Sequence, residues 1–227
     1  MLLASRGWRV AVATRSEPSD ADALRTALGT DGSLRRCDAT DERSLDAWLR
    51  AVDADHGRAD ALVHAAGPFH RTDDGCGDAA LWQRAHDDNV LPVVRTCGRL
   101  LPTMSSGGWG RVVLFGHAGA STLRPAPSIA AWYAAKASVL AYARALAAQT
   151  AGSGVTVNCI TPGVLDTGGI DGALFARMAA AVPGGVPGRA EDAAALAAWL
   201  LSEEAGHVTG AELCVAGGWD LPRTRGR

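Results

Sequence analysis

The chain has 227 residues, of which 48% are hydrophobic and 20% are charged, and its formal net charge is −2. This length suits one domain over residues 1–227, and the near-neutral charge gives no sign of a nucleic-acid partner. Its apolar runs are too short to cross a bilayer, and the first residues lack the basic and apolar regions of a secretion signal. We therefore expect a cytoplasmic protein without a membrane partner.

Short apolar segments alternate with longer stretches of helical period along the chain. The sequence begins within the end of a helix, MLLASRG, which leads into the first predicted strand. The predicted strands are residues 8–13, 33–37, 61–65, 111–115, 155–160 and 212–215. The predicted helices are residues 18–28, 42–54, 78–103, 128–150 and 190–203. This alternation predicts an α/β fold with a Rossmann-like doubly wound parallel sheet.

The segment 161–187 is rich in glycine and proline around a short helical piece, ALFARMAAA. A long loop at the carboxyl end of a strand is where open α/β sheets usually bind and cover ligands. The G-x-G-x-x-A match at residues 75–80 has no strand directly before it, and nearby aspartates would repel phosphate. We therefore expect no nucleotide-binding turn there.

Five cysteines are present, at positions 37, 76, 97, 159 and 214. No two have the C-x-x-C spacing of a zinc site or a redox pair, so we expect reduced, mostly buried thiols and no metal site.

Six motifs follow one another in order: RVAVATR, CDATD, ALVHAAG, DDNV, NCITPGVLDT and the segment 188–219. Together they resemble the short-chain dehydrogenase/reductase family, especially its acyl-carrier-protein ketoreductases. The resemblance implies roles in cofactor binding for Arg15 toward a 2′-phosphate, for Asp38 toward adenine, and for Ala66, Gly67 and Thr167. It also implies a first strand and a T-G-x-x-x-G-x-G turn, which this sequence lacks. We therefore expect a sheet without its first strand. The two strands that normally flank it would then pair with each other, be covered by another element, or keep unpaired backbone groups.

The stretch IAAWYAAKASVL contains the single lysine of the chain, Lys136. The family has a tyrosine four residues before this lysine, on the same helix face, and here that position holds Trp132. An indole N–H only donates and does not titrate near neutrality, so Trp132 cannot replace the tyrosine as a proton donor. Tyr133 lies about 100° further around the helix and would reach the site only if the helix start were rewound.

Two histidines stand where the family has small polar residues. His117 follows Gly116 in place of a pair of serines, and His64 replaces an asparagine, while Asn89 of the family pattern is retained. Each histidine could be a structural hydrogen-bonding group, or the pair could support acid–base chemistry beside Lys136.

Three functions follow from these departures. We first expect a redox-inactive subunit that binds no cofactor alone and supports an intact NADP-dependent homologue, as in aminocoumarin biosynthesis, where a carrier-protein-bound 3-hydroxyacyl thioester is oxidised. The partner, or a second copy of this chain, would dock through helices 78–103 and 128–150. The second alternative is a cofactor-independent cyclase, dehydratase or isomerase that uses Lys136. The third is an ordinary NADP-dependent reductase with further residues before Met1.

Overall fold

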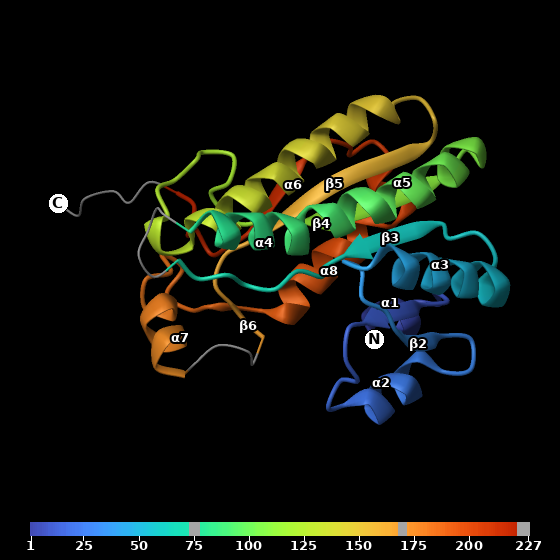
Figure 1. Ribbon diagram of the computed structural model, residues 1–227, viewed down its shortest axis with the longest axis horizontal. Helices are drawn as coiled ribbons and strands as arrows, with labels where there is room; N and C mark the ends of the chain where they lie inside the picture. The colour runs from blue at the N-terminus through green and yellow to red at the C-terminus, as the bar shows by residue number, and fades with distance from the viewer. Residues whose placement is uncertain (73–77, 168–171, 222–227) are drawn as a thin grey trace.

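The computed structural model describes residues 1–72, 78–167 and 172–221, and Figure 1 shows their arrangement. The strands are β1 (Ala11–Thr14), β2 (Ser33–Arg36), β3 (Ala61–His64), β4 (Gly110–Phe115), β5 (Val155–Pro162), β6 (Leu165–Asp166), β7 (Gly188–Arg189) and β8 (Glu212–Val215). The helices are α1 (Leu2–Ser5), α2 (Ala21–Leu28), α3 (Glu42–His56), α4 (Ala79–Asn89), α5 (Leu91–Ser106), α6 (Ala130–Gln149), α7 (Gly172–Ala179) and α8 (Ala190–Leu200), with short 3₁₀ turns at Pro127–Ile129 and Glu203–Ala205.

A parallel sheet in the order β3-β4-β5-β8 forms the centre of the fold. Every pairing in it is parallel, and β4 aligns with β5 over six residues. Almost all of β4 and β5 is buried, as expected for parallel strands that are covered on both faces. The predicted α/β fold with a parallel sheet is therefore confirmed.

Helices cover both faces of this sheet, which makes it doubly wound (Figure 1). One hydrophobic cluster joins β3, β4 and β5 to α4, α5 and α6. A second cluster joins β4, β5 and β8 to α8, with Leu3 of α1 at its margin. Nine residues of α6 are buried, and Lys136 is one of them.

The strands β1 and β2 form a separate parallel pair. Among the described residues, β1 does not pair with β3, although both line the same cavity. The facing edges of β1 and β3 therefore stay unpaired within the described residues, which is one of the three outcomes expected from the sequence.

Local differences from the predicted elements have simple causes. The predicted helix 78–103 is two helices that meet at Val90, and Pro92 stands in the first turn of the second, where a missing N–H costs nothing. The glycine- and proline-rich segment 161–187 contains the short strand β6, which pairs in parallel with β7 directly after the segment. Residues 75–77, which begin the rejected glycine motif and include Cys76, lie outside the described residues. No helix in the described ranges is long and apolar enough to span a membrane.

The described cysteines are free thiols, and Cys37, Cys97 and Cys159 are buried whereas Cys214 is exposed. No cluster of potential metal ligands occurs within the part of the chain that the structure describes.

Candidate active site

The candidate site lies at the carboxyl ends of three central strands. His64 is the last residue of β3, His117 follows β4, and α6 carries Lys136 toward the same edge. Parallel strands place their carboxyl ends together, so residues distant in the sequence meet here.

Lys136 is the central charged group of the site. Its side chain is buried to 6% exposure, and its ammonium group donates a hydrogen bond of 3.3 Å to the carbonyl of Phe115. Burial lowers the pKa of Lys136 to about 8, because an ammonium loses hydration inside the protein. A group with this pKa exchanges a proton readily near neutral pH.

Asn89 and Gly67 approach Lys136 closely. Asn89 is fully buried, and its amide nitrogen donates to the carbonyls of Ala85 and Pro68 at 3.0 and 3.2 Å. A Cβ atom at Gly67 would lie 2.4 Å from Asn89 Oδ1 and 3.3 Å from Lys136 Nζ, and the φ of Gly67 is +140°. A glycine is therefore required at this position for two reasons, the close contact and the backbone conformation.

Trp132 forms one wall of the site, together with two other rings. Its ring centre lies 5.0 Å from that of Phe69 and 4.9 Å from that of His117, both in edge-to-face geometry. Lys136 Nζ lies 5.9 Å from the same indole. The indole N–H of Trp132 is buried and has no hydrogen-bond partner among the described residues.

Both histidines are neutral at physiological pH. Burial, together with the charge of Lys136, lowers the pKa of His64 and of His117 to about 4. His64 Nδ1 is buried and has no partner within the described residues. Neutral imidazoles with such low pKa values do not act as proton donors at pH 7, whereas the ammonium of Lys136 can.

The hydroxyl of Tyr133 is bonded to the backbone. It donates to the carbonyl of Gly119, and burial raises the pKa of the phenol. The site also has no room for a serine at position 116, because a Cβ atom at Gly116 would lie 2.9 Å from Thr161 and 3.1 Å from Cys159. The ring of Tyr133 also lies 5.7 Å from that of His117, in edge-to-face geometry.

Comparisons with known proteins identify the family. A crystal structure described as a short-chain dehydrogenase/reductase from Burkholderia xenovorans superposes with a TM-score of 0.87 at 28% identity, covering 98% of this chain and 88% of that one. The model of the family described as enoyl-(acyl carrier protein) reductase matches residues 1–220. The chain belongs to the short-chain dehydrogenase/reductase family.

Two relatives within the family are oxidoreductases by name. Cis-4-hydroxycyclohexanecarboxylate dehydrogenase of Sinomonas cyclohexanicum is 36% identical, over 96% of this chain and 89% of that protein. The 3-oxoacyl-[acyl-carrier-protein] reductase FabG of Escherichia coli (strain K12) is 30% identical, over 95% of this chain and 88% of that protein. These relatives overturn the expected redox-inactive subunit, and they do not favour the cofactor-independent cyclase, dehydratase or isomerase. The prediction was wrong because it took the absent first strand and the replaced residues at positions 64, 116, 117 and 132 as loss of function, whereas relatives that align over most of this chain are named as oxidoreductases.

The residues expected to bind a cofactor lie in two groups beyond the carboxyl ends of the strands. Arg15 follows β1 and donates to Asp38 at 3.2 Å, and both side chains are partly exposed. Burial opposes ionisation of Asp38, but hydrogen bonds from Thr40 and the charge of Arg15 lower its pKa. Gly67 lies beside Lys136 at the other end, and Thr167 is exposed after β6.

These residues fit the two ends of a nicotinamide dinucleotide. An exposed arginine beside an ionised aspartate suits the adenosine end, and the unpartnered atoms around Lys136 suit the reacting end. Phe69 and the carbonyl of Phe115 also border Trp132 and Lys136, although no sequence pattern predicted this. Nothing in the sequence near Phe69 signals a site residue, because its contact with Trp132 depends on the tertiary fold.

Proposed function

We propose that this chain is an oxidoreductase that interconverts a ketone and a secondary alcohol, with Lys136 as its acid–base group. The observation that carries the proposal is the buried lysine with a pKa of about 8, beside polar atoms of His64, Asn89 and Trp132 that have no partner within residues 1–72, 78–167 and 172–221. Buried polar atoms without partners are costly unless a ligand or water satisfies them, so this edge of the sheet suits a polar reacting group.

Reduction of a ketone adds a hydride to the carbonyl carbon and a proton to the carbonyl oxygen. A bound nicotinamide would supply or accept the hydride. Lys136 donates the proton to the oxygen in reduction, and its neutral amine accepts a proton in oxidation. The N–H of Trp132 holds the same oxygen by a hydrogen bond, without exchanging its proton.

The substrate that we propose is apolar and carries its carbonyl on a ring. The wall formed by Trp132, Phe69 and His117 suits contact with a flat or cyclic hydrocarbon. Phe69 is 56% exposed, which leaves its face available to a ligand. The relative named for cis-4-hydroxycyclohexanecarboxylate supports this class, whereas the relative named for 3-oxoacyl carrier proteins supports a linear β-keto thioester as the competitor.

We propose NADP as the cofactor, bound by this chain itself. Arg15 would contact the 2′-phosphate and Asp38 the adenine, while Ala66 and Gly67 would border the nicotinamide beside Lys136 and Thr167 would contact it from the loop after β6. Direct titration of the purified chain with NADPH distinguishes this proposal from the sequence-based expectation that the chain alone binds no cofactor.

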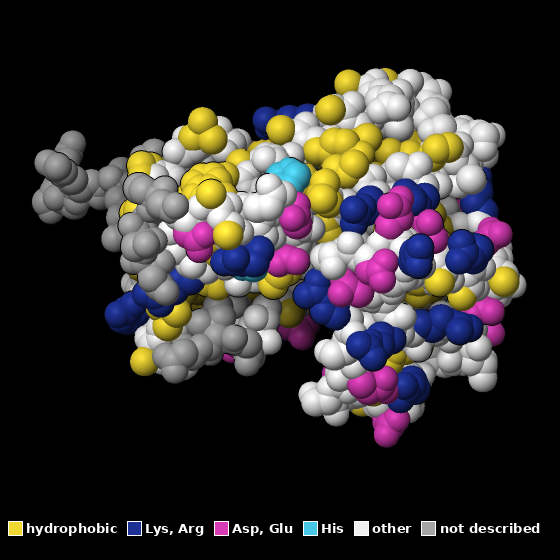
Figure 2. Space-filling model, in the orientation of Figure 1, with side chains coloured by type: hydrophobic (Ala, Val, Ile, Leu, Met, Phe, Trp, Pro, Cys, Tyr) yellow, Lys and Arg dark blue, Asp and Glu magenta, His cyan; other side chains and the backbone are white. Residues whose placement is uncertain are grey.

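A second copy of this chain is the partner that we propose for α4, α5 and α6. In the view of Figure 2, apolar side chains gather between α5 and α6, whereas charged side chains of both signs cover the region of α2 and α3. Trp82 of α4 is 42% exposed, which is unusual for so large an apolar side chain. A cytoplasmic location, without membrane or nucleic-acid partners, completes the proposal.

The deciding experiment measures NADPH oxidation by the purified chain with 4-oxocyclohexanecarboxylate and, separately, with a 3-oxoacyl thioester. We expect turnover of the cyclic ketone that Lys136→Met reduces by about a hundredfold or more, the usual contribution of a general acid. Tyr133→Phe is the matched comparison on α6, and we expect it to keep activity within about threefold, because its hydroxyl bonds Gly119. Absence of turnover with either substrate and either nicotinamide, or an active Lys136→Met variant, would overturn the proposal. If Tyr133→Phe loses activity and Lys136→Met does not, the proton donor is Tyr133 and not Lys136.

A further inference from the structure

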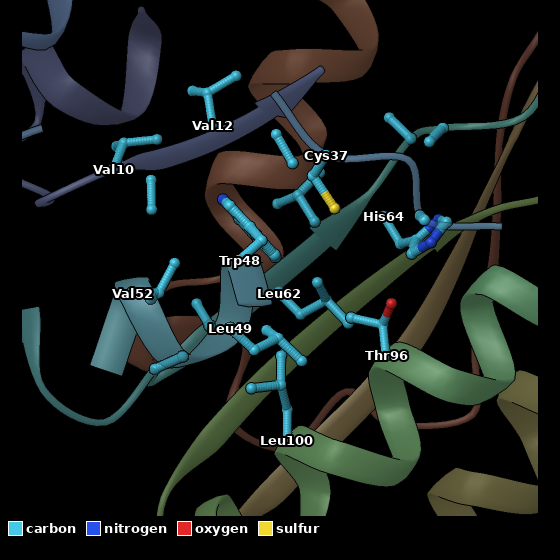
Figure 3. A pocket seen from close by; sticks show the side chains of 18 of the residues that line it. Val10, Val12, Cys37, Trp48, Leu49, Val52, Leu62, His64, Thr96 and Leu100 are labelled. Atoms are coloured by element: carbon cyan, nitrogen blue, oxygen red, sulfur yellow. The ribbon is translucent and has the colours of Figure 1, made fainter. Parts of the chain in front are cut away.

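The two histidines of the candidate site border different spaces. His64 lines a cavity of about 950 Å³ beside β3, where most of the side chains labelled in Figure 3 are apolar. His117 lies against Trp132 and Tyr133 instead, with ring centres 4.9 and 5.7 Å away. Because Trp132 and His117 form the wall proposed for the substrate, the groups around His117 decide which substrates fit.

The loop between β4 and α6 carries His117 and folds back on itself at Gly119. The carbonyl of Gly119 accepts hydrogen bonds from the amides of Thr122 and Arg124, at 3.2 and 3.3 Å, and from the hydroxyl of Thr122 at 3.0 Å. The hydroxyl of Tyr133 donates to the same carbonyl. A Cβ atom at Gly119 would lie only 3.4 Å from the Cβ atom of Arg124. The fold of the loop thus returns Arg124 to the segment that carries His117.

The turn that places Arg124 contains a strained residue. Leu123 has a φ of +50°, the only positive φ among the described residues other than glycine. Such a conformation persists only where the surrounding structure imposes it, and it is concentrated at active sites and ligand clamps. Leu123 is also 73% exposed, so packing of its own side chain does not offset the strain. What this turn accomplishes is the placement of the next residue, Arg124.

The guanidinium of Arg124 is held in place but not neutralised. Its Nη1 donates to the carbonyl of Trp219, and its central carbon lies 5.4 Å from the centre of the Trp219 ring. The residue is partly buried, and it forms no ion pair with any carboxylate in the described part of the chain. A cation removed from water without a counter-ion is unfavourable, so this guanidinium suits an anionic group of a ligand.

The positive charges of Arg124 and Lys136 both act on His117. Burial is the main cause of the low pKa of His117, and each of these two charges lowers it further. One imidazole therefore lies within the electrostatic reach of both cations. Since Lys136 is the group proposed to protonate the ketone, a substrate that lies against His117 can meet Lys136 with its carbonyl and Arg124 with another polar group.

We propose that Arg124 selects the substrate by charge, because it binds a carboxylate that the cyclic ketone carries at the end of its apolar ring away from the carbonyl. The planar guanidinium matches the two oxygens of a carboxylate through two parallel N–H···O bonds. The substrate class is thus a cyclic keto acid and not a neutral ketone. This inference rests on the proposed reduction at Lys136 for the place of the carbonyl, but binding of the carboxylate requires no turnover.

The probes are cyclohexanecarboxylate and cyclohexanecarboxamide, which have nearly the same shape and differ in charge. Isothermal titration calorimetry of the full chain at neutral pH, with and without NADP, gives the Kd of each. We expect the wild type to bind the carboxylate about tenfold to a hundredfold more tightly, the usual value of a hydrogen bond to a charged group. Arg124→Gln should weaken the carboxylate to the Kd of the carboxamide and leave the carboxamide within about twofold. Arg124→Lys keeps the charge and should keep part of the difference.

Two further variants separate charge recognition from other effects. Lys136→Met should keep the preference for the carboxylate, because Lys136 faces the other end of the ring. Trp219→Leu removes the ring beneath the guanidinium but leaves the carbonyl that Arg124 bonds, and it should also keep the preference. In the wild type, the NMR signal of the Arg124 Nε–H should shift with the carboxylate and not with the carboxamide, which gives a test that depends on no variant.

Three results would overturn the proposal. The first is an equal Kd of the two probes for the wild type. The second is an equal loss of both probes in Arg124→Gln, which would limit Arg124 to holding the loop against Trp219. The third is a preference that Lys136→Met abolishes and Arg124→Gln keeps, which would place the carboxylate at Lys136.

The proposed reduction and the carboxylate site can fail separately. If the chain reduces no ketone but the Kd values differ as expected, the proposed reduction is wrong and the carboxylate site is supported. If the chain reduces cyclic ketones and binds the two probes equally, the carboxylate site alone is wrong.

Discussion

The ammonium of Lys136 lies 5.9 Å from the ring centre of Trp132, one turn along the same face of α6. The position that the family gives to a titrating phenol thus holds a ring that can donate a hydrogen bond but cannot exchange a proton. Since the flanking histidines have pKa values of about 4, the lysine is the group beside this ring that can change its charge near pH 8.

The pH dependence of ketone reduction should report Lys136 directly. The ammonium is the proton donor, so the rate should be constant at lower pH and should fall about tenfold for each pH unit above about 8. The rate of alcohol oxidation should increase as the pH rises through about 8. Steady-state rates from pH 6 to 10 provide the measurement, and a reduction rate that is unchanged between pH 7 and 10 would contradict the assignment.

Lys136→Met should change how stability depends on pH. The pKa of Lys136 is about 8 in the folded protein and 10.5 in the unfolded chain, so between these values the unfolded state binds more protons. The free energy of unfolding of the wild type should therefore rise with pH in this window, by up to about 3 kcal/mol relative to the variant. Urea denaturation of both proteins at pH 7.5 and 10 gives the comparison, and taking the difference cancels the titration of groups such as Cys97, whose pKa does not depend on Lys136. Parallel curves for the two proteins would contradict the prediction.

Gly67→Ala should destabilise the protein more than Gly152→Ala. Both glycines have a positive φ, but a Cβ atom at Gly67 meets Asn89 and Lys136, whereas one at Gly152 meets nothing within 4 Å. We expect a loss of about 1 to 3 kcal/mol at Gly67 beyond the strain that both positions share. Thermal and urea denaturation measure this difference, and equal losses at the two positions would show that Asn89 and Lys136 move aside without cost.

Trp132→Tyr should accelerate reduction, because a phenol donates its proton and the nearby ammonium of Lys136 lowers its pKa. We expect kcat to increase by about tenfold to a hundredfold, within the usual range for general acid catalysis. Trp132→Phe is the control, since it keeps a ring against Phe69 and His117 but loses the N–H, and it should be slower than the wild type. If all three proteins have the same kcat, the side chain at position 132 does not act on the substrate oxygen.

The two buried histidines should make the protein sensitive to acid. Their pKa values fall from 6.5 in the unfolded chain to about 4 in the folded protein, so the unfolded state binds more protons between these values. The free energy of unfolding should therefore decrease as the pH falls from 6.5 to 4, by up to about 3 kcal/mol for each histidine. His64→Gln and His117→Gln, compared with the wild type by urea denaturation at pH 7 and 4.5, should each reduce this decrease. A variant that loses stability as steeply as the wild type would contradict the role of that histidine.

The amino-acid sequence alone determined the α/β class, the approximate strands, and the position of Lys136 relative to Trp132. These follow from local periodicity and from the fixed geometry of a helix turn, which do not depend on distant contacts. The sequence-based expectation of a redox-inactive subunit, drawn from the absent first strand and several replaced residues, was overturned by relatives that are named as oxidoreductases.

The tertiary structure alone decided the environment of the site. The contact of Phe69 with Trp132, the hydrogen bond from Lys136 to Phe115, and the approach of Gly67 to Asn89 join segments that lie 21 to 63 residues apart in the chain. The low pKa values of the histidines likewise arise from burial by these segments. The cavity between β1 and β3 is also a tertiary feature, because only the relative placement of two sheets shows which of the described strands line it.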